Sequence, residues 1–152
     1  MKATFDTNIL VYAADWKSGD KHLVAADLLR RAGSADFFLT LQVLGEFFRV
    51  ATRKGKRTPA DARGFVDDWR AVFPVFAADE GCLADAMGAV SEHGLPFWDA
   101  MIWAAARRAE CRLFITEDFQ DGRALGGVTF VNPFEERNAV LLGAALTPSR
   151  GG

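Results

Sequence analysis

The sequence predicts an α/β fold, in which a central parallel sheet of four to five strands is flanked by helices. Short β-type runs alternate along the chain with longer segments whose apolar residues recur at helical spacing. Strands separated by helices pair in parallel through crossover connections, and the helices then cover both faces of the sheet. Half of the 152 residues are apolar and 25% are charged, which fits one compact domain.

Five segments are expected to form the sheet. Each is a short apolar run that ends at a polar or turn residue, as buried strands do. The segments are residues 3–5, 37–40, 74–76, 112–116 and 128–131.

Six helices are expected between these strands. The one at Pro59 has the clearest start, because Thr58 suits the N-cap position, proline suits the first helical position and Asp61 follows in the first turn. Gly33 and Gly94 are expected to end two others. The expected helices span residues 9–12, 20–32, 41–53, 59–71, 79–92 and 97–109.

The chain is expected to form one domain over residues 1–136, followed by a loosely ordered tail over residues 137–152, where the pattern fades. No apolar stretch is long enough for a membrane span, and Asp6 comes too early for a signal peptide. Cys82 and Cys111 stand far apart without a metal-binding spacing, which favours a reducing cytoplasm. The net charge of -2 excludes a protein that binds nucleic acid by bulk positive charge alone.

Four carboxylates stand in unusually apolar settings. Asp6 and Asp118 follow two expected strands, at the carboxyl ends where open α/β sheets place their sites. Asp99 lies on the apolar stripe of its helix, and Glu46 shares a face with Val43. Clustered carboxylates repel one another, and a hard cation such as Mg²⁺ or Mn²⁺ resolves that repulsion with oxygen ligands. We therefore expect a metal site.

Each of these acids also has a purely structural interpretation. Asp6 can be a helix cap, and Asp99 can be favoured by the helix dipole. Glu46 can pair with Arg49 or a later arginine of its helix, and Asp118 can be a turn residue.

Five segments together resemble a known family, the PIN-domain ribonucleases, and within it the VapC-type toxins of bacterial toxin–antitoxin pairs. In order and spacing the resemblance covers about residues 2–134. The segments are FDTNILVY (5–12), QVLGEFF (42–48), FWDAMI (97–102), TEDFQDG (116–122) and VNPF (131–134).

The resemblance implies a PIN-like three-layer fold over residues 1–136 and a Mg²⁺ site formed by the four acids. The hydroxyls of Thr7 and Thr116 would orient water or a carboxylate, and Asn8 would steady the first loop. Members of the family differ in which acid of the late loop binds metal, so Asp121 and then Glu117 are alternatives to Asp118. The implied ligands are Asp6, Glu46, Asp99 and Asp118, and the implied supporting residues are Thr7, Asn8 and Thr116.

The expected function is Mg²⁺-dependent hydrolysis of RNA phosphodiester bonds by the toxin of a toxin–antitoxin pair. The resemblance implies a homodimer and a small antitoxin that covers the acidic site. Arg49, Arg53 and Lys54 could form an RNA-binding rim, although cations at a helix end are also common. Trp98 and Trp103 are expected in the core, and would stack on bases only if exposed.

Two other functions stay open. A phosphatase with a nucleophilic Asp6 is disfavoured, because such enzymes use a second aspartate two residues on, where this chain has Asn8. The chain could also be a non-catalytic RNA- or protein-binding module whose acids are structural. The charge does not decide between them, since setting the four acids aside leaves a mildly basic remainder.

Overall fold

The computed structural model describes residues 1–53 and 56–148. Six strands form one sheet in the order β3-β2-β1-β4-β6-β5, and every pairing is parallel except that of β5 with β6. The strands are β1 (Ala3–Phe5), β2 (Phe37–Thr40), β3 (Val75–Phe76), β4 (Leu113–Ile115), β5 (Ala124–Leu125) and β6 (Val128–Val131). The helices are α1 (Thr7–Ala14), α2 (Asp20–Ala32), α3 (Leu41–Thr52), α4 (Pro59–Val72), α5 (Glu80–His93), α6 (Phe97–Arg108) and α7 (Ala139–Ala145), with 3-10 turns η1 (Trp16–Ser18) and η3 (Glu136–Asn138).

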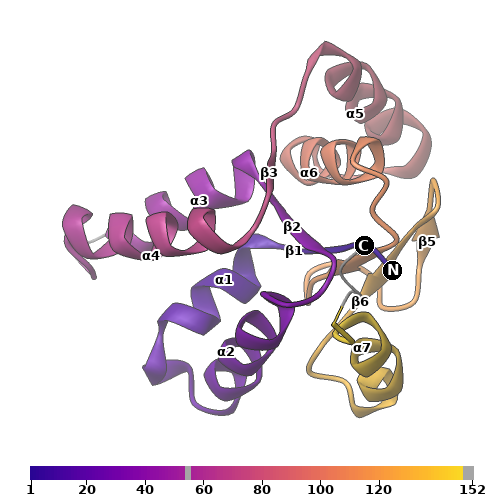
Figure 1. Cartoon of the computed structure of the whole chain (residues 1–152). Helices are drawn as coiled ribbons and strands as arrows, with labels where there is room; N and C mark the ends of the chain where they lie inside the picture. The colour runs from indigo at the N-terminus through magenta and orange to yellow at the C-terminus, as the bar shows by residue number, and fades with distance from the viewer. Residues whose placement is uncertain (54–55, 149–152) are drawn as a thin grey trace.

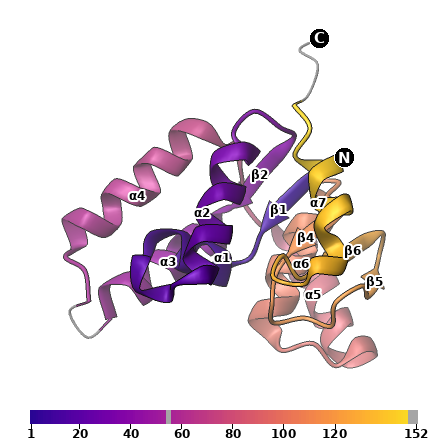
Figure 2. The same cartoon turned by 90° about the horizontal axis from the view of Figure 1, so that it is seen from below.

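The elements form three layers. Helices α1, α2 and α7 lie on one side of the sheet and α5 and α6 on the other, while α3 and α4 project beside α1 (Figure 1, Figure 2). Phe5, Phe114 and Phe130, from three adjacent strands, are completely buried between the layers. The predicted fold, a mostly parallel sheet flanked by helices, is confirmed.

Local sequence signals account for most of the element boundaries. The hydroxyl of Thr58 accepts a hydrogen bond from the N–H of Asp61, and Pro59 is the first residue of α4, as predicted. Gly94 ends α5 with φ of 67°, a left-handed conformation that glycine adopts without strain.

The hairpin β5–β6 was not expected. Leu125 pairs with Val128 across a two-residue turn, in which Gly126 and Gly127 have φ of 57° and 80°. Two glycines with positive φ suit the twist of such a hairpin. The indole N–H of Trp103 donates to the carbonyl of Leu125 at 3.1 Å, so α6 anchors the short strand.

The expectation of a loosely ordered tail from residue 137 is wrong for residues 139–146. They contain α7, and Leu142, Ala145 and Leu146 are buried at helical spacing. The sequence signal was weak because this helix is almost entirely apolar, with Val140 left 86% exposed. Residues 149–152 of the expected tail lie outside the described residues.

Trp98 was also misplaced in the core. It lies in the first turn of α6 and is 63% exposed, whereas Ile102 and Trp103 in the later turns are buried as expected. In the part of the chain that the structure describes, the helices are too short or too polar for any of them to cross a membrane.

Candidate active site

The pairing of the two central strands brings Asp6 and Thr116 together. Phe5 of β1 is in register with Ile115 of β4, so the residues that follow them leave the sheet side by side. The hydroxyl of Thr116 donates to Asp6 Oδ2 at 2.7 Å, and the N–H of Thr7 donates to Asp6 Oδ1 at 2.7 Å. Asp6 is therefore the N-cap of α1 and also the centre of the site.

Burial disfavours the ionised form of Asp6. Only 6% of the residue is exposed, and the loss of hydration raises its pKa to about 7. Its hydrogen bonds with Thr116 and Thr7 lower the pKa, while the charges of Asp118 and Asp99 raise it further. At neutral pH this carboxyl group needs either a proton or a cation.

Asp99 and Asp118 are close enough for their charges to interact. Burial raises the pKa of Asp99, and the charges of Asp118 and Glu46 add to the increase. Asp118 is exposed, and its backbone N–H donates to the Thr116 hydroxyl at 3.1 Å. The charges of Asp99 and Asp118 thus act on Asp6, and those of Asp118 and Glu46 act on Asp99, and we refer to these four acids as the cluster.

Glu46 is held by neutral donors. The hydroxyl of Thr7 donates to Oε2 at 2.6 Å and the amide of Gln42 to Oε1 at 2.9 Å. The Gln42 amide also donates to the carbonyl of Trp98 at 3.0 Å, which links α3 to the start of α6. Among the described residues no arginine pairs with Glu46, so the ion-pair alternative is wrong for them.

Gln42 is a site residue that the sequence reasoning missed. It precedes Glu46 by four residues, which is one turn of α3, and an amide at that spacing can bond to the glutamate. Within the described residues neither polar atom of the buried Asn8 side-chain amide has a hydrogen-bond partner, and its expected role in the first loop stays a prediction.

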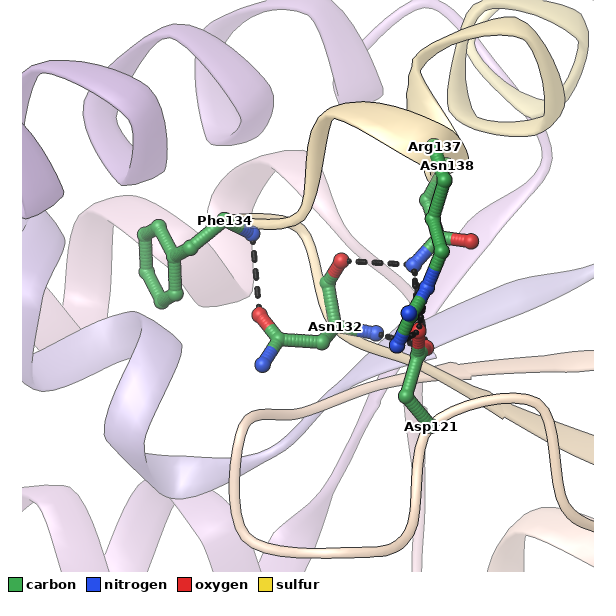
Figure 3. A network of polar contacts seen from close by, with 5 residues as sticks. All are labelled: Asp121, Asn132, Phe134, Arg137 and Asn138. Carbon is green, nitrogen blue, oxygen red and sulfur yellow. Dashed lines mark hydrogen bonds and ion pairs between the residues drawn. The ribbon is translucent and has the colours of Figure 1, made fainter.

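The two alternative acids of the late loop are already neutralised. Glu117 accepts hydrogen bonds from the hydroxyl of Tyr12 and, at 2.7 Å, from the ammonium group of Lys21. Asp121 binds the segment after β6 (Figure 3). Burial alone would raise the pKa of Asp121, but hydrogen bonds from Asn132 and Arg137 bring it below its usual value.

Two of the three residues expected to form the basic rim lie on the surface of the protein. Arg49 and Arg53 are exposed near the end of α3, beyond Glu46, whereas Lys54 lies outside the described residues. Arg57, farther along, donates to the carbonyl of Ala14 and packs over Phe65 at 4.9 Å from the ring centroid.

The donor chemistry of the cluster fits a hard divalent cation. Asp6, Glu46, Asp99 and Asp118 offer only carboxylate oxygens, which Mg²⁺ prefers, and their mutual repulsion favours a bound cation. Within the described residues no three acidic, histidine or cysteine side chains are already arranged around one metal position. Mg²⁺ does not require such a group, because it keeps several waters and typically takes one or two protein carboxylates together with substrate phosphates.

Comparisons with known proteins identify the family and the fold of the chain. The model of one protein family, the PIN domain, matches residues 3–120. A toxin–antitoxin complex from Klebsiella pneumoniae has a similar structure, with a TM-score of 0.64 and 25% identity over 88% of this chain and 99% of that one.

Two further solved structures share the fold. The sarcin–ricin loop cleaving toxin VapC20 from Mycobacterium tuberculosis has a TM-score of 0.60 and 19% identity over 74% of this chain and 87% of that one. VapBC2 from Rickettsia felis, bound to a DNA fragment from its promoter, has a TM-score of 0.63 and 17% identity over 86% and 97% of the two chains. No curated protein matches the chain significantly.

Proposed function

The chain belongs to the PIN-domain family, and from that premise we propose that it is a Mg²⁺-dependent endoribonuclease that acts as the toxin of a toxin–antitoxin pair. The observation that carries the proposal is that burial and the charges of neighbouring acids raise the pKa values of Asp6, which follows β1, and of Asp99, in the first turn of α6. A buried carboxylate without a cationic partner destabilises the fold, and a bound cation would offset that cost at Asp6.

Asp6 and Asp99 would be the principal metal ligands, with Glu46 and Asp118 completing the site directly or through water. When bound, Mg²⁺ or Mn²⁺ lowers the pKa of a coordinated water and stabilises charge on the phosphate. The hydroxyl of Thr116 fixes the orientation of the Asp6 carboxylate, and Thr7 does the same for Glu46. Both acids are thereby held in place before a substrate arrives.

RNA is the proposed substrate. The fold is shared with VapC20, whose description as a sarcin–ricin loop cleaving toxin names an RNA target. Arg49 and Arg53 lie on the exposed end of the helix that carries Glu46, where they could contact phosphates, and Lys54 follows them in the sequence. Trp98 is 63% exposed, and its backbone carbonyl and Glu46 both accept from the Gln42 amide, which supports its indole as a surface for base stacking.

We also propose an antitoxin partner, a homodimer and a cytoplasmic location. Similar folds occur in toxin–antitoxin complexes, which supports the antitoxin. Exposed apolar side chains on α3 and α6, Leu41 and Phe97, support a second copy as the partner of this face. Leu41→Lys should lower the mass measured by light scattering to that of a monomer, whereas Val140→Lys, on α7, should leave it unchanged.

Cleavage of end-labelled RNA by the purified chain tests the main proposal. Wild type should cut RNA in millimolar Mg²⁺ and stop on chelation, and Asp99→Asn should lose activity while it stays folded. Asp68→Asn, an exposed carboxylate on α4, is the matched control and should cut like wild type. Cleavage that survives both chelation and Asp99→Asn would contradict the metal site, and a folded wild type that binds RNA without cutting it would favour the non-catalytic binding module.

A further inference from the structure

The loop that carries Asp118 is held at both ends by residues from distant parts of the chain. Asp118 itself is exposed, and its position depends on residues 116–122 around it. On one side Glu117 binds Tyr12 and Lys21 of α1 and α2. On the other side Asp121 binds the segment Asn132–Asn138, which follows β6.

Asp121 uses both carboxylate oxygens for these contacts (Figure 3). Oδ1 accepts from the N–H of Asn132 at 2.8 Å and from the amide of Asn138 at 2.9 Å. Oδ2 accepts from Arg137 Nε at 2.8 Å and Nη2 at 2.7 Å, and from the same Asn138 amide at 3.1 Å. A carboxylate has about four lone-pair positions, so a metal ion at Asp121 would have to displace these donors.

The segment that binds Asp121 is itself tied to the other end of the loop. The N–H of Phe134 donates to Asn132 Oδ1 at 2.9 Å, as drawn in Figure 3. The ring of Phe134 meets Tyr12 edge to face at 5.5 Å, and the ammonium group of Lys21 lies over both rings, at 5.1 and 5.3 Å. Tyr12 and Lys21 also bind Glu117. The residues on either side of Asp118 are therefore connected to each other through one continuous set of contacts.

We infer that Asp121 is a positioning residue that, with Arg137 and Asn138, fixes the loop and so sets the affinity of the acidic cluster for a divalent cation. The family model ends at residue 120, so this assigns a role in the site to residues 121–138, beyond the matched domain. The inference rests on the proposed function only for the identity of the ion. We call these contacts, of Asp121 with Asn132, Arg137 and Asn138, the loop clasp.

Mn²⁺ binding, measured by electron paramagnetic resonance on the purified chain, tests the clasp without depending on catalysis. Arg137→Met and Asn138→Ala should each weaken Mn²⁺ binding by about tenfold, the lower end of what outer partners of metal ligands contribute. Arg63→Met is the matched control, because that exposed arginine pairs with Asp67 on α4. It should bind Mn²⁺ like wild type.

Conservative replacement separates positioning from ligation. Asp121→Asn keeps an oxygen that can accept from the Asn132 N–H, so it should bind Mn²⁺ more tightly than Asp121→Ala. At saturating metal, kcat for RNA cleavage should recover to within about twofold of wild type in Asp121→Asn and in Asp121→Ala. The kcat of Asp118→Asn should not recover.

Two results would overturn the inference. One is Mn²⁺ affinity unchanged in both Arg137→Met and Asn138→Ala, even if their melting temperatures fall, since that outcome marks a merely structural role. The other is an Asp121→Asn variant as weak as Asp121→Ala and not rescued by excess metal, which marks a ligand. A wild type that binds Mn²⁺ but cuts no RNA would defeat the proposed nuclease, while the Mn²⁺ affinities of the variants would still decide the clasp.

Discussion

Replacing Asp6 by asparagine should stabilise the metal-free protein while abolishing its activity. The carboxyl group is 6% exposed and its pKa is raised from 3.8 to about 7, chiefly by loss of hydration. The folded state therefore prefers the protonated group, and ionisation at neutral pH opposes folding. Asparagine removes the charge and keeps an oxygen for the N–H of Thr7.

The size of the effect follows from the two pKa values. Between pH 3.8 and 7 the unfolded chain releases the Asp6 proton before the folded one does, so stability falls across this window and is level above it. A difference of about three pKa units lowers the stability of wild type by about 4 kcal/mol at pH 8 and by about 2 kcal/mol at pH 5. For a domain of this size each kcal/mol shifts the melting temperature by about 2–4 °C.

Thermal unfolding at pH 8 and pH 5, with and without Mg²⁺, measures this effect. The gain in stability of Asp6→Asn over wild type should be about two to three times larger at pH 8 than at pH 5, and Mg²⁺ should reduce this difference by stabilising wild type alone. Asp68→Asn, an exposed acid on α4, should show neither response. If the gain in stability of Asp6→Asn were equal at the two pH values, or if the variant were less stable than wild type at pH 8, burial of an unneutralised charge would not dominate this site.

Three further substitutions test other contacts. Thr116→Val removes the hydroxyl that donates to Asp6, so it should raise the pKa of Asp6 further, seen as a shift of the pH–stability profile to higher pH, and it should weaken Mn²⁺ binding measured by titration. Gln42→Leu removes a donor to Glu46 at 2.9 Å and should lower kcat more than it changes KM, as loss of positioning in the transition state does; an unchanged kcat would deny Gln42 a role. Gly126→Ala places a side chain at φ of 57° with its Cβ 3.0 Å from Arg107 and Trp103, which should cost about 1–3 kcal/mol in chemical denaturation, and a neutral outcome would show that the hairpin turn tolerates L-residues.

The sequence could predict the elements that hydrophobic period and capping residues specify. Thr58 with Pro59 marked the start of α4, and the apolar run before Thr116 marked β4. It could not predict α7, whose residues lack a polar face, or β5, which has two residues and depends on the anchor from Trp103. In both cases the missing information is tertiary packing.

The residues of the candidate site likewise differ in whether the local sequence could identify them. The sequence identified acids in apolar surroundings, because a strand end or a helix stripe can be read locally. It could not choose among Glu117, Asp118 and Asp121, since their partners lie far along the chain: Lys21 is 96 residues from Glu117, and Arg137 is 16 residues from Asp121. Gln42 was missed for a related reason, because its second contact is with Trp98, 56 residues away.

The proposed metal ligands differ from the structural acids of the late loop in that the fold supplies the latter, but not the former, with a cationic partner among the described residues. Asp121 has Arg137, and its pKa is lowered despite its burial. Asp6 has two hydrogen bonds but no cationic partner among the described residues, and its pKa is raised to about 7. Hydrogen bonds from neutral groups therefore orient the Asp6 carboxylate without offsetting its desolvation. The charge that the fold leaves uncompensated there is the charge that a divalent ion would neutralise, and the same criterion assigns Asp99 to the site and Asp121 to its support.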